Sequence, residues 1–83
     1  MSEGDVVLPA IGEIIRKKRK ACGHSLRDTA RLAGVSLSTP YRIEIGVPVA
    51  YEYLLRVCLL YRIDPMRWAR RAYRGIRPAV KPG

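Results

Sequence analysis

Histidine and cysteine are scarce in this chain of 83 residues, which holds one histidine, His24, and two cysteines, Cys22 and Cys58. A structural zinc site needs about four such ligands, and the sequence contains no Cys-x-x-Cys pair. We therefore expect no metal site, and we interpret both cysteines as packing thiols. His24 is expected to lie at the surface or to have its hydrogen bonds satisfied, because no second ligand or nucleophile is spaced to join it.

Groups that support catalysis are also missing. The sequence has no paired carboxylates in a glycine-flanked site, no phosphate-binding glycine loop and no nucleophile close to a base along the chain. A chain of this length builds one modest core and leaves no room for a large cleft beside it. We therefore expect no enzymatic activity, no cofactor and no small-molecule ligand.

Long hydrophobic runs are absent as well. A helix that spans a bilayer needs about 20 apolar residues, and a secretory signal needs a basic start and a longer apolar run than Val6-Val7-Leu8. The chain instead begins with the polar and acidic stretch from Met1 to Asp5. We expect a cytoplasmic protein that does not enter a membrane.

Acidic residues are few, with 7 Asp and Glu against 16 Lys and Arg, which gives a net charge of +9. Such an excess produces a positive field that attracts polyanions, so nucleic acid is the first candidate partner. The alternative is a charged coat that only keeps the protein in solution. Because hydrophobic residues make up 48% of the chain, we expect a folded domain rather than a disordered basic segment.

Hydrophobic periodicity and helix-end signals predict an all-α domain of five helices. The expected helices span residues 9–22, 26–33, 37–45, 50–62 and 65–74. Ser25 and Asp28 form a capping box before the second helix, and Ser36 is the expected N-cap of the third. Gly34 ends the second helix, so two short helices meet across a tight turn. Asp64, followed by proline, marks the start of the fifth.

The domain is expected to lie between two irregular ends. Residues 1–8 lack periodicity and are interpreted as a flexible N-terminal arm, residues 9–75 as the folded domain, and residues 76–83 as an irregular basic tail. No strand signal of weight is found, and Pro48 and Val49 are interpreted as the start of the fourth helix.

The stretch between Gly23 and Gly46 resembles the Xre/Cro-type (lambda repressor-like) helix-turn-helix family of phage, plasmid and prokaryotic repressors. The matching segments are Gly23-His24-Ser25-Leu26-Arg27-Asp28-Thr29-Ala30, Ala33-Gly34-Val35-Ser36 and Arg42-Ile43-Glu44-Ile45-Gly46. Further matches extend the resemblance over about residues 10–68 and are Ile11-Gly12, Arg19, Leu54, Val57 and Ile63-Asp64. The resemblance implies a compact five-helix DNA-binding domain whose third helix enters the major groove, usually as a homodimer on a palindromic operator. It implies a transcriptional regulator of the repressor type, located on the nucleoid.

The start of the third helix supplies the candidates for base recognition, which are Leu37, Ser38, Tyr41 and Arg42. Arg42 has the forked donors that match O6 and N7 of guanine, and Leu37 suits a thymine methyl group. Ser38 and Tyr41 suit bases or phosphates, and the sequence does not decide between them. The alternative for each residue alone is an ordinary solvated side chain.

Candidate phosphate contacts lie on the first two helices. Free N–H groups and the helix dipole at the second helix favour a phosphate near Ser25, Leu26 and Arg27, and the family uses this position in that way. The basic side of the first helix adds three weaker candidates, for which a merely solvated face is the alternative. They are Arg16, Lys17 and Lys20.

Arg19 lies on the side of the first helix that is expected to face the core, where a half-buried arginine needs an acidic partner. The family carries a glutamate at the position of Glu44, paired to such an arginine, so the resemblance implies a structural Arg19–Glu44 ion pair. The alternative is that the long Arg19 side chain reaches water.

Three residues depart from the family pattern. Pro40 stands early in the third helix where an aliphatic residue is usual, so the aim of that helix stays open. Thr29 replaces leucine or valine, and its hydroxyl is expected to bond back to a backbone carbonyl. His24 replaces an apolar residue before the second helix.

The fifth helix has an apolar side and a basic side, and its candidates for a dimer or accessory DNA contact are Trp68, Tyr73, Arg70 and Arg74. Trp68 has a competing interpretation as a core residue. The alternatives for the whole domain are a protein-interaction module and a nonspecific nucleic-acid binder that uses this basic helix. A membrane-surface role is weak, because about ten residues bury too little apolar area.

Overall fold

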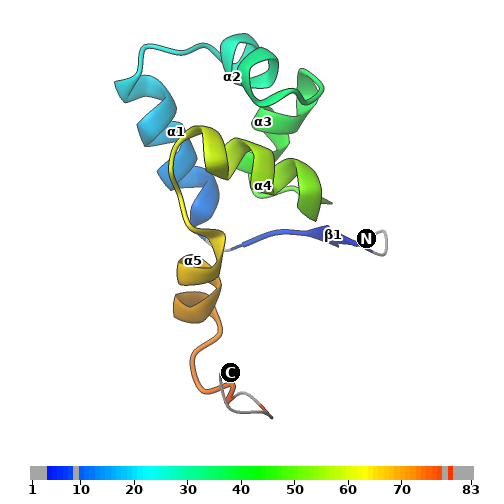
Figure 1. Cartoon of the computed structure of the whole chain (residues 1–83), viewed down its shortest axis with the longest axis vertical. Coiled ribbons are helices and arrows are strands. Elements are labelled where there is room, and N and C mark those ends of the chain that lie inside the picture. Colours follow the sequence, from blue (N-terminus) through cyan, green and yellow to red (C-terminus); the bar gives the residue numbers. More distant parts are fainter. Residues whose placement is uncertain (1–3, 9, 78, 80–83) are drawn as a thin grey trace.

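The computed structural model describes residues 4–8, 10–77 and 79, and within them the chain forms five helices and two short strands (Figure 1). The elements in chain order are β1 (Asp5–Val6), α1 (Ile11–Ala21), α2 (Leu26–Ala33), α3 (Ser38–Glu44), β2 (Val49–Ala50), α4 (Tyr51–Leu60) and α5 (Pro65–Ala72). The expected all-α domain of five helices is confirmed. Pro9, expected to begin the first helix, lies outside the described residues, as do tail residues 78 and 80–83.

Two helix starts follow the predicted capping chemistry. The backbone N–H of Asp28 donates to the Ser25 hydroxyl at 3.0 Å, and the N–H of Ser25 donates to the Asp28 carboxylate at 2.9 Å. The Asp64 carboxylate likewise accepts a 3.0 Å hydrogen bond from the N–H of Met66, with Pro65 as the first residue of α5. Both helices therefore begin where local side-chain hydrogen bonds satisfy the free N–H groups of the first turn.

The start of α3 differs from the prediction. The Ser36 hydroxyl does not cap the helix, because it lies 2.9 Å from the Thr39 hydroxyl and 3.3 Å from the Ser38 hydroxyl. Leu37, which precedes the helix, has helical backbone angles and caps no N–H group with its side chain. Pro40 is buried at the third position of α3, where its missing N–H would have had no partner within the helix. The proline therefore interrupts no helical hydrogen bond.

A pair of two-residue strands corrects the expectation that the chain holds no strand. β1 pairs antiparallel with β2, with Asp5 opposite Ala50 and Val6 opposite Val49. Val49 was expected at the start of the fourth helix, but the backbone stays extended through Ala50 and α4 begins at Tyr51. Strands this short show no alternation of side chains, so their sequence gives no signal. Asp5 and Val6, within the N-terminal arm predicted for residues 1–8, have extended backbone in this pairing.

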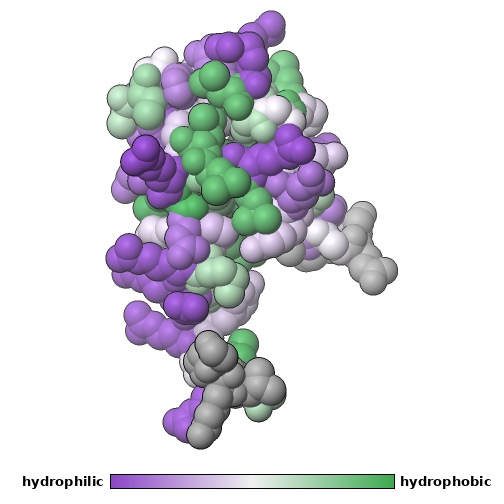
Figure 2. All heavy atoms as spheres, in the orientation of Figure 1, coloured by the Kyte–Doolittle hydropathy of each residue, from purple (hydrophilic) through white to green (hydrophobic). Residues whose placement is uncertain are grey.

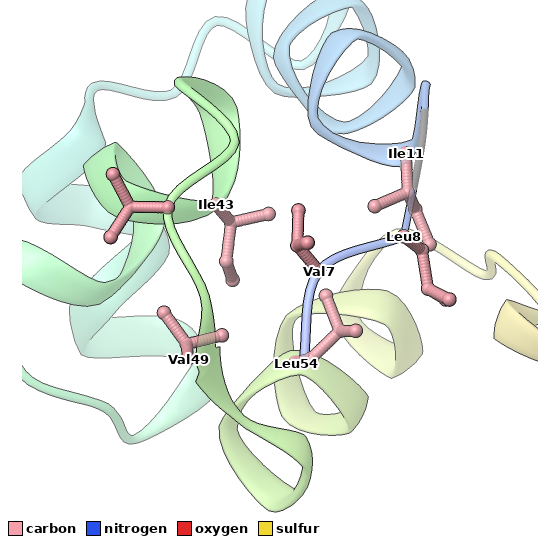
Figure 3. A pocket seen from close by; sticks show the side chains of 7 residues that line it. Val7, Leu8, Ile11, Ile43, Val49 and Leu54 are labelled. Atoms are coloured by element: carbon pink, nitrogen blue, oxygen red, sulfur yellow. The ribbon is translucent and has the colours of Figure 1, made fainter. Parts of the chain in front are cut away.

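The core lies between α1, α3 and α4 and is closed by the segment that follows β1. Its buried hydrophobic residues are Ile11, Ile15, Ile43, Val49, Leu54, Val57, Cys58, Tyr61 and Ile63. Val7 and Leu8, which follow β1, line a small space together with Ile11, Ile43 and Leu54 (Figure 3). They leave a space of about 10 Å³ between them, which is at the lower limit for one water molecule. The first residues of the domain are therefore part of its packing.

The outer surface is divided between apolar and polar regions. In the view of Figure 2, hydrophobic side chains form a stripe over α4, and hydrophilic side chains surround it. α5 contributes no fully buried residue and extends away from the other helices (Figure 1). Trp68 is its link to the body of the domain, since this side chain is partly buried against the core. The interpretation of Trp68 as a packing residue is supported by this contact.

Candidate nucleic-acid interface

The turn between α2 and α3 fixes the angle at which α3 leaves the core. Gly34 ends α2 with a left-handed φ of 70°, a conformation that favours glycine. The N–H of Val35 then returns to the carbonyl of Ala30 at 3.0 Å, and the Val35 side chain packs against the core. These contacts hold the start of α3, so the helix presents a fixed outer face.

Every predicted base-recognition residue lies on that outer face. Leu37, Ser38, Tyr41 and Arg42 are exposed, whereas Thr39, Pro40 and Ile43 are buried on the opposite side. The four residues predicted to face outward are therefore all exposed. Ile45 was not predicted as part of this face, but it is exposed four residues after Tyr41. Its spacing from Tyr41 could have indicated this, although Ile45 stands at the predicted end of the helix.

A hollow of about 290 Å³ lies beside α3 and joins it to α1 and α2. Its lining residues are Arg16, Arg19, Leu26, Tyr41, Glu44 and Ile45. The structure thus brings one candidate phosphate residue from α1 and one from α2 to the side of the base-recognition helix. The outer faces of three helices meet there in one concave surface.

The Arg19–Glu44 ion pair lies at this hollow. Arg19 donates from Nε to Glu44 Oε2 at 2.7 Å and from Nη2 to Oε1 at 3.0 Å, a forked geometry that fixes both side chains. A third bond runs from Arg19 Nη1 to the carbonyl of His24 at 2.9 Å. The side chains are only 11% and 8% exposed, so the alternative that Arg19 extends into water is wrong. The hydrogen bond with Glu44 raises the pKa of Arg19, and the guanidinium stays charged.

The remaining phosphate candidates are not equivalent. Ser25 and Arg27 are exposed at the start of α2, and Lys20 is exposed on α1. Lys17 is also exposed, but its ammonium lies 3.3 Å from the Glu13 carboxylate one turn earlier. Neither Lys17 nor Lys20 lines the hollow beside α3. Of the three phosphate candidates on α1, Arg16 is therefore the one that lines the hollow beside α3.

Thr29, Tyr61 and His24 form a polar cluster near the start of α2, and only one of its hydrogen bonds was predicted from the sequence. The Thr29 hydroxyl donates to the carbonyl of Ser25 at 3.2 Å, as expected, but it also lies 2.5 Å from the Tyr61 hydroxyl. His24 Nδ1 lies 3.1 Å from the same Tyr61 oxygen. Tyr61, at the end of α4, therefore satisfies two residues that depart from the family pattern. Burial raises the pKa of Tyr61, so the phenol remains protonated at neutral pH.

On α5 the candidate contacts lie apart from α3. Arg70, Tyr73 and Arg74 are exposed, and a second hollow, of about 350 Å³, runs along this helix toward Ile76. Trp68 faces the core instead, with the Arg71 guanidinium 5.3 Å from its ring centre. The four predicted contacts of α5 therefore do not form one surface.

No protein-family model and no curated protein sequence matches this chain. Among the described residues, no three His, Cys, Asp or Glu side chains lie together as a metal site requires. No helix in the described part of the chain has the length and apolar composition needed to cross a membrane.

Proposed function

We propose that this domain binds double-stranded DNA sequence-specifically, as an Xre/Cro-type helix-turn-helix repressor. The observation that carries the proposal is the outer face of α3, which is exposed over its whole length beside the exposed start of α2. The major groove admits one α-helix, and a short helix held across a tight turn suits it. The net charge of +9 supplies the attraction for phosphate.

Within this proposal Arg42 forms the principal base contact. Its guanidinium is exposed and has no acidic partner among the ion pairs of the described residues, so it is available for the O6 and N7 atoms of a guanine. A forked contact of this kind discriminates against other bases by about 1–3 kcal/mol. Ser38, exposed on the same face, supplies a hydroxyl for a neighbouring base or phosphate.

Phosphate contacts at the start of α2 hold the domain in register. The N–H of Asp28 is already used by the Ser25 hydroxyl, which leaves the N–H groups of Leu26 and Arg27 for a phosphate because they have no partner four residues earlier. The Arg27 side chain, exposed at the start of α2, and Arg16, which lines the hollow, add positive charge to this surface. These contacts position α3 without carrying sequence information.

The ion pair of Arg19 and Glu44 has a structural role in this proposal. It joins α1 to the last residue of α3 by two short hydrogen bonds. Because Arg19 neutralises the Glu44 carboxylate, Glu44 does not repel the DNA backbone. The angle between α1 and α3 therefore stays fixed when α3 enters the groove.

Self-association through α5 completes the proposal, since a dimer would recognise two half-sites related by two-fold symmetry. Met66, Tyr73 and Ile76 form an exposed apolar side along the hollow of this helix. Tyr73→Glu should shift the protein from dimer to monomer in sedimentation equilibrium, whereas Arg67→Ala, an exposed position on the same helix outside that hollow, should not. A monomeric wild type at micromolar concentration would contradict a dimer of this kind.

The test of DNA binding is selection from a random duplex library, followed by titration of the enriched sequence against random duplex over a range of salt. We expect a preference of at least about 10³. Arg42→Ala should remove most of it, and Arg42→Lys, which keeps the charge but loses the fork, should restore little. Arg67→Ala removes one charge from α5, at the other end of the domain (Figure 1), and should keep the preference.

Equal binding of both duplexes, with a steep salt slope that Arg42→Ala hardly changes, would contradict the proposal. That outcome would assign the domain to nonspecific nucleic-acid binding. An absence of DNA binding at low salt would assign it to protein interaction.

A further inference from the structure

The outer face of α3 carries a row of apolar side chains. Leu37, Tyr41 and Ile45 lie four residues apart, which places them on one side of the helix and its two flanking residues. Their exposed fractions are 53%, 53% and 54%. Thr39 and Pro40 are buried on the opposite side. The helix therefore presents apolar side chains away from the core as well as toward it, and nothing in the described chain covers the outer row.

Positive charge borders this row. Arg16 of α1 lines the same hollow as Tyr41 and Ile45. The acid at that hollow, Glu44, is neutralised by Arg19 at 2.7 Å. A partner that fits must carry negative charge at its margins and apolar groups between them. The major groove has this arrangement, with phosphates along both edges and pyrimidine methyl groups on its floor.

We infer that Leu37, Tyr41 and Ile45 recognise the C5-methyl groups of pyrimidines in the DNA site, an inference that rests on the proposed function. The C5-methyl of thymine is the one apolar group that base pairs present in the major groove. Eight residues of helix extend about 12 Å, which corresponds to roughly three or four base-pair steps. A site recognised by α3 therefore holds several such methyl groups next to the guanine that Arg42 contacts.

The test uses the duplex obtained by selection from the random library. Each thymine is replaced singly by deoxyuridine, which removes the methyl group and leaves O4 and base pairing unchanged. Affinity should fall about four-fold for each contacted methyl group, at two or more positions, because one buried methyl contributes about 0.8 kcal/mol. At the same positions, 5-methylcytosine opposite guanine should bind about four-fold more tightly than cytosine opposite guanine. The two arms test the methyl group separately on thymine and on cytosine.

Variants of the row connect each methyl group to a side chain. Leu37→Ala and Ile45→Ala should each abolish the deoxyuridine effect at one position and retain it at the others. Leu59→Ala, which removes an exposed leucine from α4, should retain the effect at every position. Thermal unfolding of each variant, followed by circular dichroism, establishes that the fold is intact.

The outcomes separate the inference from the function on which it rests. An enriched sequence whose affinity is indifferent to every deoxyuridine would overturn the inference and leave the proposed function standing. A selection that enriches no sequence would remove both. If Leu37→Ala and Ile45→Ala change the oligomeric state and leave the deoxyuridine effects intact, the row is a protein interface and the inference is wrong.

Discussion

Gly12 of α1 packs directly against the backbone of Ile43 in α3. A methyl group at Gly12 would overlap the Ile43 carbonyl oxygen and would lie 3.1 Å from the Cα atom of Glu44. Both neighbours are backbone atoms, which cannot turn aside as a flexible side chain can. The absence of a side chain at Gly12 therefore sets how closely α1 approaches the proposed recognition helix.

Gly12→Ala should destabilise the domain by about 1–3 kcal/mol, because overpacking against backbone outweighs the gain of about 1 kcal/mol in helix propensity. The measurement is urea unfolding followed by circular dichroism. Glu13→Ala, an exposed position on the same helix, is the matched control and should cost less than about 0.5 kcal/mol. A Gly12→Ala protein at least as stable as wild type would show that α1 can move away from α3 freely.

Breaking the ion pair between Arg19 and Glu44 should be costly on either side. Glu44→Met and Arg19→Met should each lower the free energy of unfolding by about 2–3 kcal/mol, because each leaves a largely buried charge without its partner. Replacing both residues by methionine should cost clearly less than the sum of the two single changes. A double-mutant cycle in urea measures this coupling, and additive costs would contradict it.

Tyr61 should contribute through its hydroxyl as well as its ring. Tyr61→Phe removes the partner of Thr29 and of His24 and should cost about 1–3 kcal/mol. Thr29→Val should cost less, since the Tyr61 hydroxyl keeps its contact with His24. Thermal unfolding of both variants and of the double variant checks this, and the double variant should be more stable than additivity predicts. Unchanged stability in Tyr61→Phe would show that water replaces the hydroxyl without loss.

The two cysteines should react very differently. Cys22 is exposed and Cys58 is buried, so the interpretation as a packing thiol is confirmed for Cys58 and wrong for Cys22. Burial raises the pKa of the Cys58 thiol from 9.0 to about 11. At pH 8, iodoacetamide should therefore modify Cys22 in the folded protein and both residues in urea, as measured by mass spectrometry. Rapid modification of Cys58 in the native protein would indicate that the core opens readily.

The same pKa shift predicts a pH dependence of stability. Since the folded-state pKa of Cys58 lies above the unfolded one, its contribution is complete below pH 9.0 and is lost as the pH rises through about 11. The stability difference between wild type and Cys58→Ala should therefore shrink over this range. A difference that stays constant would contradict the assigned shift.

Features that depend on near neighbours along the chain were predictable from the sequence. The capping box joins Ser25 to Asp28, only three positions further along the chain. The turn after α2 requires only a glycine, Gly34, which can adopt the left-handed conformation. The exposed and buried faces of α3 follow from helical periodicity alone. The Arg19–Glu44 ion pair was predicted from the family resemblance, and the structure shows its two hydrogen bonds.

Features that depend on distant segments were not predictable. The pairing of β1 with β2 requires residues from the two sides of α1, α2 and α3 to meet, and neither strand is long enough to show a pattern. The partner of Thr29 is Tyr61, 32 positions away in the chain. The Ser36 hydroxyl had two possible partners, a backbone N–H or Thr39, and only the structure decides between them.

The pairing of β1 and β2 also gives the domain an order of assembly during synthesis. Asp5 and Val6 are synthesised before their partner strand, which follows the whole of α3 in the chain. Until α4 is synthesised, Val7 and Leu8 lack their contact with Leu54. A nascent chain arrested before Leu54 would therefore leave these two side chains partly exposed. The residues of β1 thus reach their final contacts only after β2 has been synthesised.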